Sequence, residues 1–281
     1  MSKIAYLIAK EDWKEGLANI QNAIFGNVQE NPFDVGRQVV IVPDGFLWYV
    51  PFELLPIGEN PLIATHMVRY SPTVSLVLGD GRNNRPVTRT SVIDGPFALE
   101  DDEQLRAELV DGFTDVINTA EVLPVDFPGT GAHLGPISNQ LVVFQDMQGT
   151  QTGSYDWALA PERPGSSLRE WMKIPWSHCD VVCLPGFRTG IDAGLKQHAG
   201  GNEIFLASVG LLASGSRTVA LSRWRVGGES TYKLMGRFLE KSRELPVDQA
   251  WQLAINSIRA GQSDPAKEPR ARDFSAPIDT S

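Results

Sequence analysis

The residue types in this sequence that could act as nucleophile, base or metal ligand are two cysteines and four histidines. Cys179 and Cys183 are four residues apart in one apolar run, where extended geometry separates their Cα atoms by about 13 Å, beyond disulfide reach. The histidines are scattered along the chain at His66, His133, His178 and His198. None of them shares a helix-turn spacing with a cysteine or a carboxylate pair. We therefore predict no metal site and no cofactor, and interpret both cysteines as buried free thiols.

Other motifs that carry chemistry are absent or have a simpler explanation. The glycines between positions 190 and 201 are not followed by the Gly-Lys-Ser/Thr ending of a phosphate-binding loop, and there is no Gly-x-Ser-x-Gly nucleophile elbow. Asp44 and Glu53 could form a carboxylate pair. However, Asp44 stands in a Pro-Asp-Gly sequence, which is typical of a turn.

The composition limits the classes of protein to which this chain can belong. The 281 residues are 42% hydrophobic and carry a formal net charge of −9. That content is ample for a packed core, and an acidic balance argues against nucleic acid as a partner. No run approaches about 18 apolar residues, and the first ten residues lack the order of a signal peptide. The sequence thus predicts a soluble, cytoplasmic protein with no membrane partner.

The segment that must position any site is the apolar run Val181 to Leu184, which is followed by Pro185 and Gly186. A β-branched run without polar alternation predicts a strand covered on both faces of a parallel sheet. Because sites form at the carboxyl ends of such strands, the loop at residues 185–190 is the first candidate position.

Strand and helix patterns alternate along the rest of the chain. We expect further strands at residues 39–42, 63–70, 90–93, 115–120, 140–145 and 218–222. We expect helices at residues 74–78, 99–110, 202–214, 229–241 and 247–260. This alternation predicts an α/β fold with a doubly wound, mostly parallel sheet and helices on both faces. It also predicts three parts: an N-terminal helical segment (1–36), the α/β domain (37–260) and a polar, disordered tail (261–281).

Three segments, taken together, resemble the CHAT domain, a caspase-like domain often found beside tetratricopeptide repeats. Residues 43–55 resemble its Pro-Asp-Gly and Pro-Phe-Glu-x-Leu opening. Residues 219–226 resemble its strand ending in Ser-x-Trp-x-Val. Residues 182–190 stand where the family usually has Leu-Ser-Ala-Cys-Glu-Thr-Gly, and residues 201–203 where it has Gly-Asp-Glu. The resemblance spans about residues 37–260 and implies the caspase-like fold of the caspase, gingipain and separase cysteine peptidases.

The same resemblance assigns the two catalytic positions to residues that cannot do the chemistry. The cysteine position falls on Phe187, which has no nucleophile, and the histidine position falls on Gln148, which cannot exchange a proton near neutral pH. Loss of either member of such a dyad can cost about a millionfold in turnover. The resemblance therefore implies a pseudo-peptidase that acts as a protein-binding or regulatory module.

Several alternatives stay open at this point. Phe187 either fills the vacated site as packing or, with Arg188, forms an exposed binding anchor, with Asp146 and Glu203 nearby. An active cysteine peptidase would need a relocated dyad of Cys183 with His133 or His178. The partner is expected to be a protein or peptide, and the chain could be part of a longer one whose helical repeats bind that partner.

Overall fold

The computed structural model describes residues 13–26, 38–57, 59–78, 87–94, 121–123, 139–144, 147–148, 172, 176, 179–188, 202–223 and 229–262. The helix expected at 99–110, the strand expected at 115–120 and the tail beyond 262 lie outside these residues. Asp146 and three of the histidines (His133, His178 and His198) lie outside them too. The domain boundaries after residues 36 and 260 stay predictions.

The centre of the fold is a five-stranded sheet in the order β11-β9-β7-β5-β6. Its strands are β5 (Thr90–Asp94), β6 (Glu121–Leu123), β7 (Gln140–Phe144), β9 (Val181–Leu184) and β11 (Thr218–Leu221). All four pairings are parallel. Numbered along the chain, the strands lie in the order 2-1-3-4-5, a common doubly wound arrangement.

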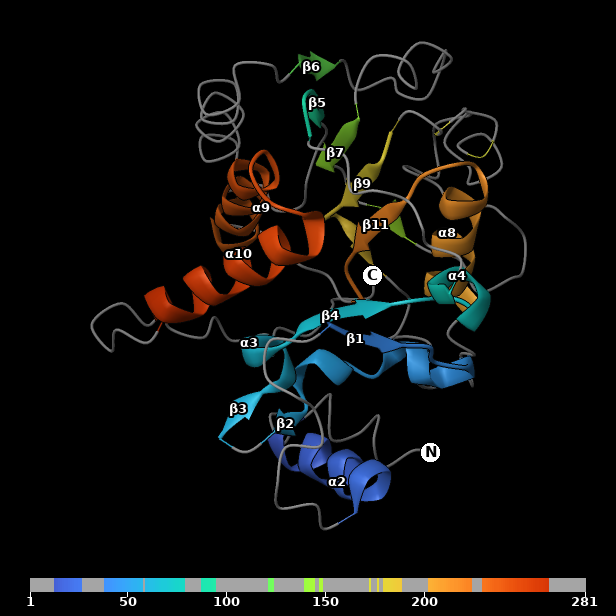
Figure 1. Cartoon of the computed structure of the whole chain (residues 1–281), viewed down its shortest axis with the longest axis vertical. Coiled ribbons are helices and arrows are strands. Elements are labelled where there is room, and N and C mark those ends of the chain that lie inside the picture. Colours follow the sequence, from blue (N-terminus) through green and yellow to red (C-terminus); the bar gives the residue numbers. More distant parts are fainter. Residues whose placement is uncertain are drawn as a thin grey trace, which may run out of the picture.

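Helices cover both faces of this sheet, which confirms the predicted fold class. Helix α8 (Asn202–Ala213) packs on one face, and helices α9 (Glu229–Ser242) and α10 (Val247–Gln262) pack on the other (Figure 1). Helix α8 ends where Gly215 adopts a φ of 115°, a left-handed conformation that favours glycine. None of the helices among the described residues is long and apolar enough to span a membrane.

Strand β9 is buried on both of its faces, as its sequence predicts. Val182 and Leu184 belong to the core cluster on the side of α8, whereas Val181 and Cys183 belong to the cluster on the side of α9 and α10. This alternation follows from the two-residue period of a strand. The residues that follow β9 are therefore held by a strand without an exposed face.

A smaller unit precedes the sheet in sequence and lies beside it (Figure 1). It contains the parallel pair β1 (Gln38–Ile41) and β4 (Met67–Tyr70), and the antiparallel pair β2 (Pro56–Ile57) and β3 (Asn60–Pro61). Its helical elements are α2 (Trp13–Phe25), η1 (Gly45–Tyr49), η2 (Phe52–Leu54), α3 (Leu62–Thr65) and α4 (Val74–Leu78). Helix α2 packs Leu17 and Ile20 against Val50 and Leu55.

The prediction of one strand over residues 63–70 is wrong in its first half. The amide N–H of His66 donates to the carbonyl oxygen of Leu62 at 2.9 Å, which closes one helical turn before β4 begins. Leu62 and Ile63 are neighbours in sequence and both are buried, which a helical turn permits and a half-exposed strand does not.

Candidate functional site

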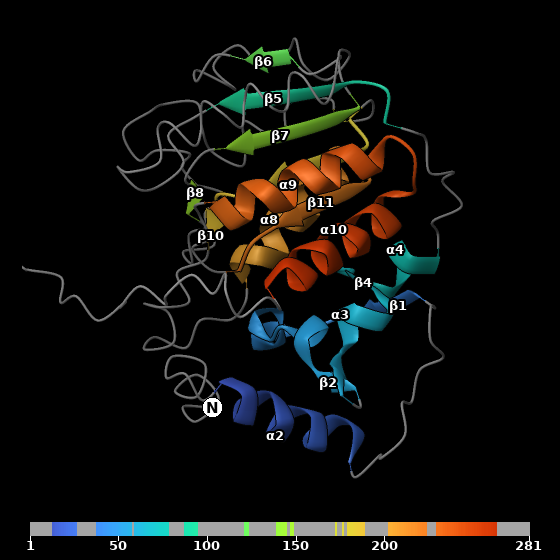
Figure 2. The same ribbon diagram turned by 90° about the vertical axis from the view of Figure 1, so that its left-hand side faces the viewer.

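Beyond the carboxyl ends of β7 and β9, two short strands bring the expected catalytic positions together. Strand β8 (Met147–Gln148) pairs in parallel with β10 (Phe187–Arg188), with Phe187 opposite Met147 and Arg188 opposite Gln148. Figure 2 shows both strands on the side toward which the arrows of β5 and β7 point. The backbone thus places Gln148 and Phe187 diagonally across a two-residue ladder, at the sheet edge where sites of this fold form.

The side chain of Phe187 is fully buried. It belongs to the core cluster on the side of α8. Other members of this cluster are Leu184 of β9, Trp48 of η1 and Ile204 of α8. A ring with no exposed surface contributes packing and offers nothing for a partner to touch. Of the two interpretations of Phe187, the structure favours packing, and a role as binding anchor would require the ring to leave this core.

Both thiols of the chain lie in the same strand region and are buried. Burial raises the pKa of Cys179 to about 12, with the adjacent Asp180 carboxylate as a second cause, and its Sγ donates to the carbonyl oxygen of Val181 at 3.4 Å. Burial also raises the pKa of Cys183, whose side chain has no solvent exposure. Because the thiolate is the reactive form, burial and the raised pKa both disfavour these groups as nucleophiles in this conformation.

We expect both thiols to resist alkylation in the native protein at pH 8 and to react fully in guanidinium. The reason is that a buried thiol whose pKa lies several units above the solution pH is almost entirely protonated. Iodoacetamide labelling followed by intact-mass measurement counts the modified groups, and the denatured sample is the control. Selective native labelling of Cys183, faster than that of a free thiol, would contradict this expectation.

For the other predicted site residues, the structure describes the backbone alone or nothing. Arg188 and Glu203 lie in β10 and α8 by their backbone, but their side chains, like that of Gln148, are outside the described part, as is the whole of Asp146. Of the residues of the alternative dyad, Cys183 with His133 or His178, the structure therefore describes only Cys183. Within the described ranges, no group of three His, Cys, Asp or Glu side chains is placed to hold a metal ion.

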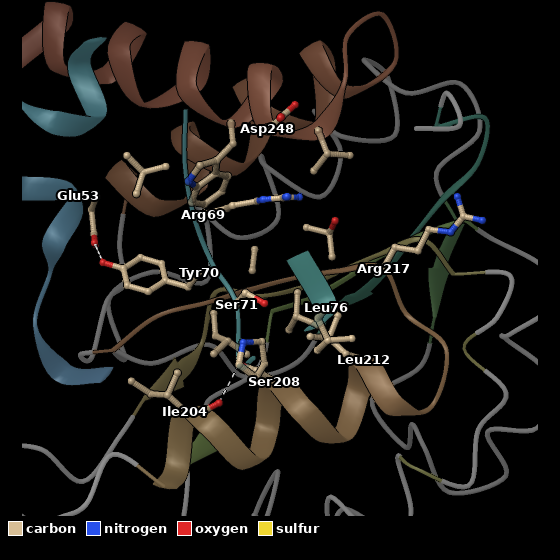
Figure 3. A pocket seen from close by; sticks show the side chains of 18 of the residues that line it. Glu53, Arg69, Tyr70, Ser71, Leu76, Ile204, Ser208, Leu212, Arg217 and Asp248 are labelled. Atoms are coloured by element: carbon tan, nitrogen blue, oxygen red, sulfur yellow. Dashed lines mark hydrogen bonds between the residues drawn. The ribbon is translucent and has the colours of Figure 1, made fainter. Parts of the chain in front are cut away.

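A polar network that the sequence did not reveal joins the first and last of the three motifs. The Nη1 of Arg223, which follows β11, lies 2.6 Å from the Oε1 of Glu53 in η2. The Nε of Arg223 donates to the carbonyl oxygen of Trp48 at 2.9 Å. The hydroxyl of Tyr70 in β4 donates to the Oε2 of Glu53 (Figure 3), and the Arg223 guanidinium lies 4.5 Å from the centre of the Tyr70 ring.

The interactions within this network keep Arg223 charged and Tyr70 neutral. Burial acts to lower the pKa of Arg223, but the Glu53 carboxylate and Tyr70 outweigh it, so the pKa is raised and the guanidinium stays charged. Burial raises the pKa of Tyr70 well above its ordinary value, and Glu53 raises it further. The Tyr70 hydroxyl therefore remains a neutral donor to the carboxylate.

This network has only an indirect signal in the sequence. The proximity of Glu53 to Asp44 in the sequence indicates a carboxylate pair, whereas the partner of Glu53 in the structure is Arg223, 170 positions away. The available signal was the presence of one charged residue in each of two distant apolar motifs, Pro-Phe-Glu and Ser-Arg-Trp. Charges in such surroundings are usually paired.

A cavity of about 360 Å³ lies beside this network. Glu53, Tyr70 and Arg223 form one part of its lining, and α8, α10, β4 and β11 supply most of the rest. Figure 3 shows α8 with Ile204, Ser208 and Leu212 on one side and Asp248 of α10 on the other. Its volume is at the lower end of the range of ligand pockets. No described residue of the β8–β10 ladder is in its lining, but Trp48 and Ile204 line the cavity and also belong to the core cluster of Phe187.

Comparisons with known proteins add the following findings. The family model of the CHAT domain matches residues 14–158, just over half of the chain. No curated protein matches the chain. Among solved structures, an NAD(P)H:quinone oxidoreductase from Methanothermobacter marburgensis is similar over 59% of this chain and 96% of its own, with 12% sequence identity and a TM-score of 0.29. A similarity this low carries no argument about fold or function.

The family match includes the Pro-Phe-Glu motif, strand β7 and the segment with Gln148, and it ends before strand β9. The parallel α/β sheet, which continues through β9 and β11 beyond the matched residues, is consistent with the caspase-like fold of this family. This chain therefore belongs to the CHAT domain family, a branch of the caspase-like peptidase clan.

Proposed function

We propose that this chain is a catalytically inactive CHAT domain, a pseudo-peptidase that acts as a protein-binding or regulatory module. The observation that carries the proposal is the buried Phe187 at the nucleophile position, in register with the segment that holds Gln148. A phenyl ring cannot attack a peptide carbonyl, and an amide cannot serve as its base.

The properties of the two thiols support the same proposal. A relocated dyad would need a cysteine with an accessible sulfur and a lowered pKa, as active-site cysteines have. Cys183 has neither, since its side chain is fully buried among Val142, Tyr232 and Met235 and its pKa is raised. The alternative of an active peptidase that uses Cys183 is thus disfavoured by the location of its nucleophile.

A covalent peptidyl probe directed at cysteine tests the proposal. We expect no labelling of the native chain by a set of acyloxymethyl ketones with varied P1 residues, and no cleavage of a peptide library, at pH 6 to 8. The chain with Cys183→Ala is the critical comparison, and Cys179→Ala is the matched control. Labelling of the native chain that disappears with Cys183→Ala but persists with Cys179→Ala would overturn the proposal.

The double change Phe187→Cys with Gln148→His is the complementary arm of this experiment. If only the reactive groups have been lost, the introduced thiol should react with the same probes, whereas Phe187→Cys alone should react far more slowly because no base accompanies it. Reaction of the double variant would show that the scaffold still presents both positions to a substrate.

A further inference from the structure

Strands β4 and β11 each have one edge that no strand covers in the described part of the chain, and both edges line the same cavity. Strand β11 pairs with β9 and strand β4 pairs with β1, with no further pairing of either among the described residues. Consecutive residues of both strands line the cavity, 68–72 from β4 with the turn that follows it and 217–223 from β11 and its flanks.

The hydrogen bonds of each strand identify the backbone groups that face away from its partner. In β11, the N–H of Thr218 donates to the carbonyl oxygen of Asp180 at 2.8 Å, so Thr218 faces β9. Alternate residues of a strand direct their N–H and C=O groups to opposite edges, which turns those of Val219 and Leu221 to the uncovered edge. In β4, the N–H of Ser71 donates to the carbonyl oxygen of Ile41 at 2.8 Å.

By the same alternation, the backbone groups of Val68 and Tyr70 face the uncovered edge of β4. These two residues, together with Val219 and Leu221, all line the cavity. Among the described residues, no strand pairs with these edges and no hydrogen bond of a turn or loop engages these backbone groups. Such uncovered edges are templates for the addition of another strand.

The walls on either side of these edges are mostly apolar. Ile204 and Leu212 of α8 line one side, and Val247, Trp251 and Ile255 of α10 line the other. The side chains of an added strand alternate between the two faces of a sheet, so both sets would meet largely apolar surface, interrupted by Ser208 on α8 and by Asp248 on α10. Helix α4 contributes Leu76, whose side chain is 41% exposed, at the rim.

We propose that this cavity binds an extended, apolar peptide segment of a partner protein, which pairs with β11 as an added strand. The proposal rests on the binding role proposed above and names the chemistry of the partner. The backbone N–H and C=O groups of an extended peptide can form hydrogen bonds with the C=O and N–H groups of Val219 and Leu221. A ligand without polar groups would leave these groups without a hydrogen-bond partner. The strand length of β11 sets the paired length at four residues.

The charge of the chain adds a preference for what flanks this segment. The net charge of −9 belongs to the chain as a whole and speeds its association with a peptide that has basic residues outside the cavity, whereas the lining itself holds Arg69, Arg217 and Arg223 beside Glu53 and Asp248. The expected motif is therefore a short run of valine, isoleucine, leucine or alanine between lysines or arginines.

An array of seven-residue peptides tests this inference directly. Each peptide has lysine at both ends, and its five central residues are drawn from Ala, Val, Ile, Leu and Ser. The best binder is labelled with fluorescein, and its dissociation constant for the full chain is measured by fluorescence anisotropy. A twin of that peptide carries N-methyl groups on alternate amides, in two versions that block one edge or the other.

Two matched variants on α4 locate the binding. Leu76→Trp places a larger ring at the cavity, whereas Val74→Trp changes an exposed residue of the same helix that is outside the lining. We expect Leu76→Trp to weaken binding by about tenfold or more, because it fills space that the peptide needs, and Val74→Trp to change it by less than about twofold. Circular dichroism and thermal unfolding verify that both variants are folded.

N-methylation supplies the second criterion. At least one methylated version should bind about tenfold more weakly, because it loses hydrogen bonds to the edge of β11. The inference is overturned if no peptide of the array binds, if both α4 variants bind alike, or if both methylated versions bind as well as the parent. Cleavage of a bound peptide would refute the proposed inactivity and leave the binding site intact. Absence of binding without cleavage would refute only this inference.

Discussion

Replacement of Arg223 by alanine is expected to lower the free energy of unfolding by about 2–3 kcal/mol, below the range of about 3–5 kcal/mol for a fully buried ion pair, because the Arg223 and Glu53 side chains are 13% and 23% exposed. The change leaves the Glu53 carboxylate with Tyr70 but without its cation, and it also removes the donor to the carbonyl oxygen of Trp48. Urea unfolding followed by tryptophan fluorescence or circular dichroism measures the loss.

The chain offers a matched control for this change. Arg237 forms an exposed ion pair with Glu240 at 3.4 Å, and its side chain is 61% exposed. Arg237→Ala should cost no more than about 1 kcal/mol, as exposed pairs do. Equal losses for the two alanine variants would contradict the structural role of Arg223. Arg223→Lys should not rescue the protein, because an ammonium group cannot reproduce the planar fork that reaches Glu53 and Trp48 together.

Phe187→Ala is expected to cost about 3–5 kcal/mol of stability, as large-to-small changes of buried aromatic residues do. The ring is fully buried beside Leu184 and Ile204, so truncation creates a cavity in the core on the side of α8. Leu253→Ala is a suitable control, since that side chain is 48% exposed on α10 and its loss should cost about 0.5 kcal/mol or less.

This expectation separates the two roles considered for Phe187. An exposed anchor would weaken partner binding on truncation and leave stability nearly unchanged. Truncation of a packing residue would instead lower the stability, and would affect partner binding only through that loss. Chemical denaturation of Phe187→Ala, compared with Leu253→Ala, distinguishes them. The same result bears on the double variant Phe187→Cys with Gln148→His. Because Phe187→Cys removes most of the same volume, that variant must be shown to be folded before its reactivity is interpreted.

The regular elements were predictable where one physical signal dominates. The strand that ends at Leu184 was predicted with its observed end, because a β-branched run buried on both faces has a clear pattern and a Pro-Gly pair ends it, whereas the expected start at Cys179 is two residues before the observed start at Val181. Strand β11 and helices α8, α9 and α10 were likewise predicted to within a few residues. Their lengths and apolar periods leave little ambiguity.

Features that depend on distant contacts could not be predicted in the same way. Strands β8 and β10 are two residues long, too short for any period to appear, and exist because β7 and β9 end side by side. The pairing of Glu53 with Arg223 depends on the approach of η2 to the end of β11. The cavity between β4 and β11 has no signature in sequence, because it is a space between elements rather than a property of any one of them.

The burial of β9 on both faces limits how the chain can be aligned with its relatives. Since Val182 and Leu184 face one core and Val181 and Cys183 the other, a one-residue insertion or deletion within the strand would exchange every side chain between the two cores. Only the turn at Pro185 and Gly186 separates this strand from β10. A change of length is therefore tolerated only at this turn, and in this chain the pairing of Phe187 with Met147 fixes which residue faces β8.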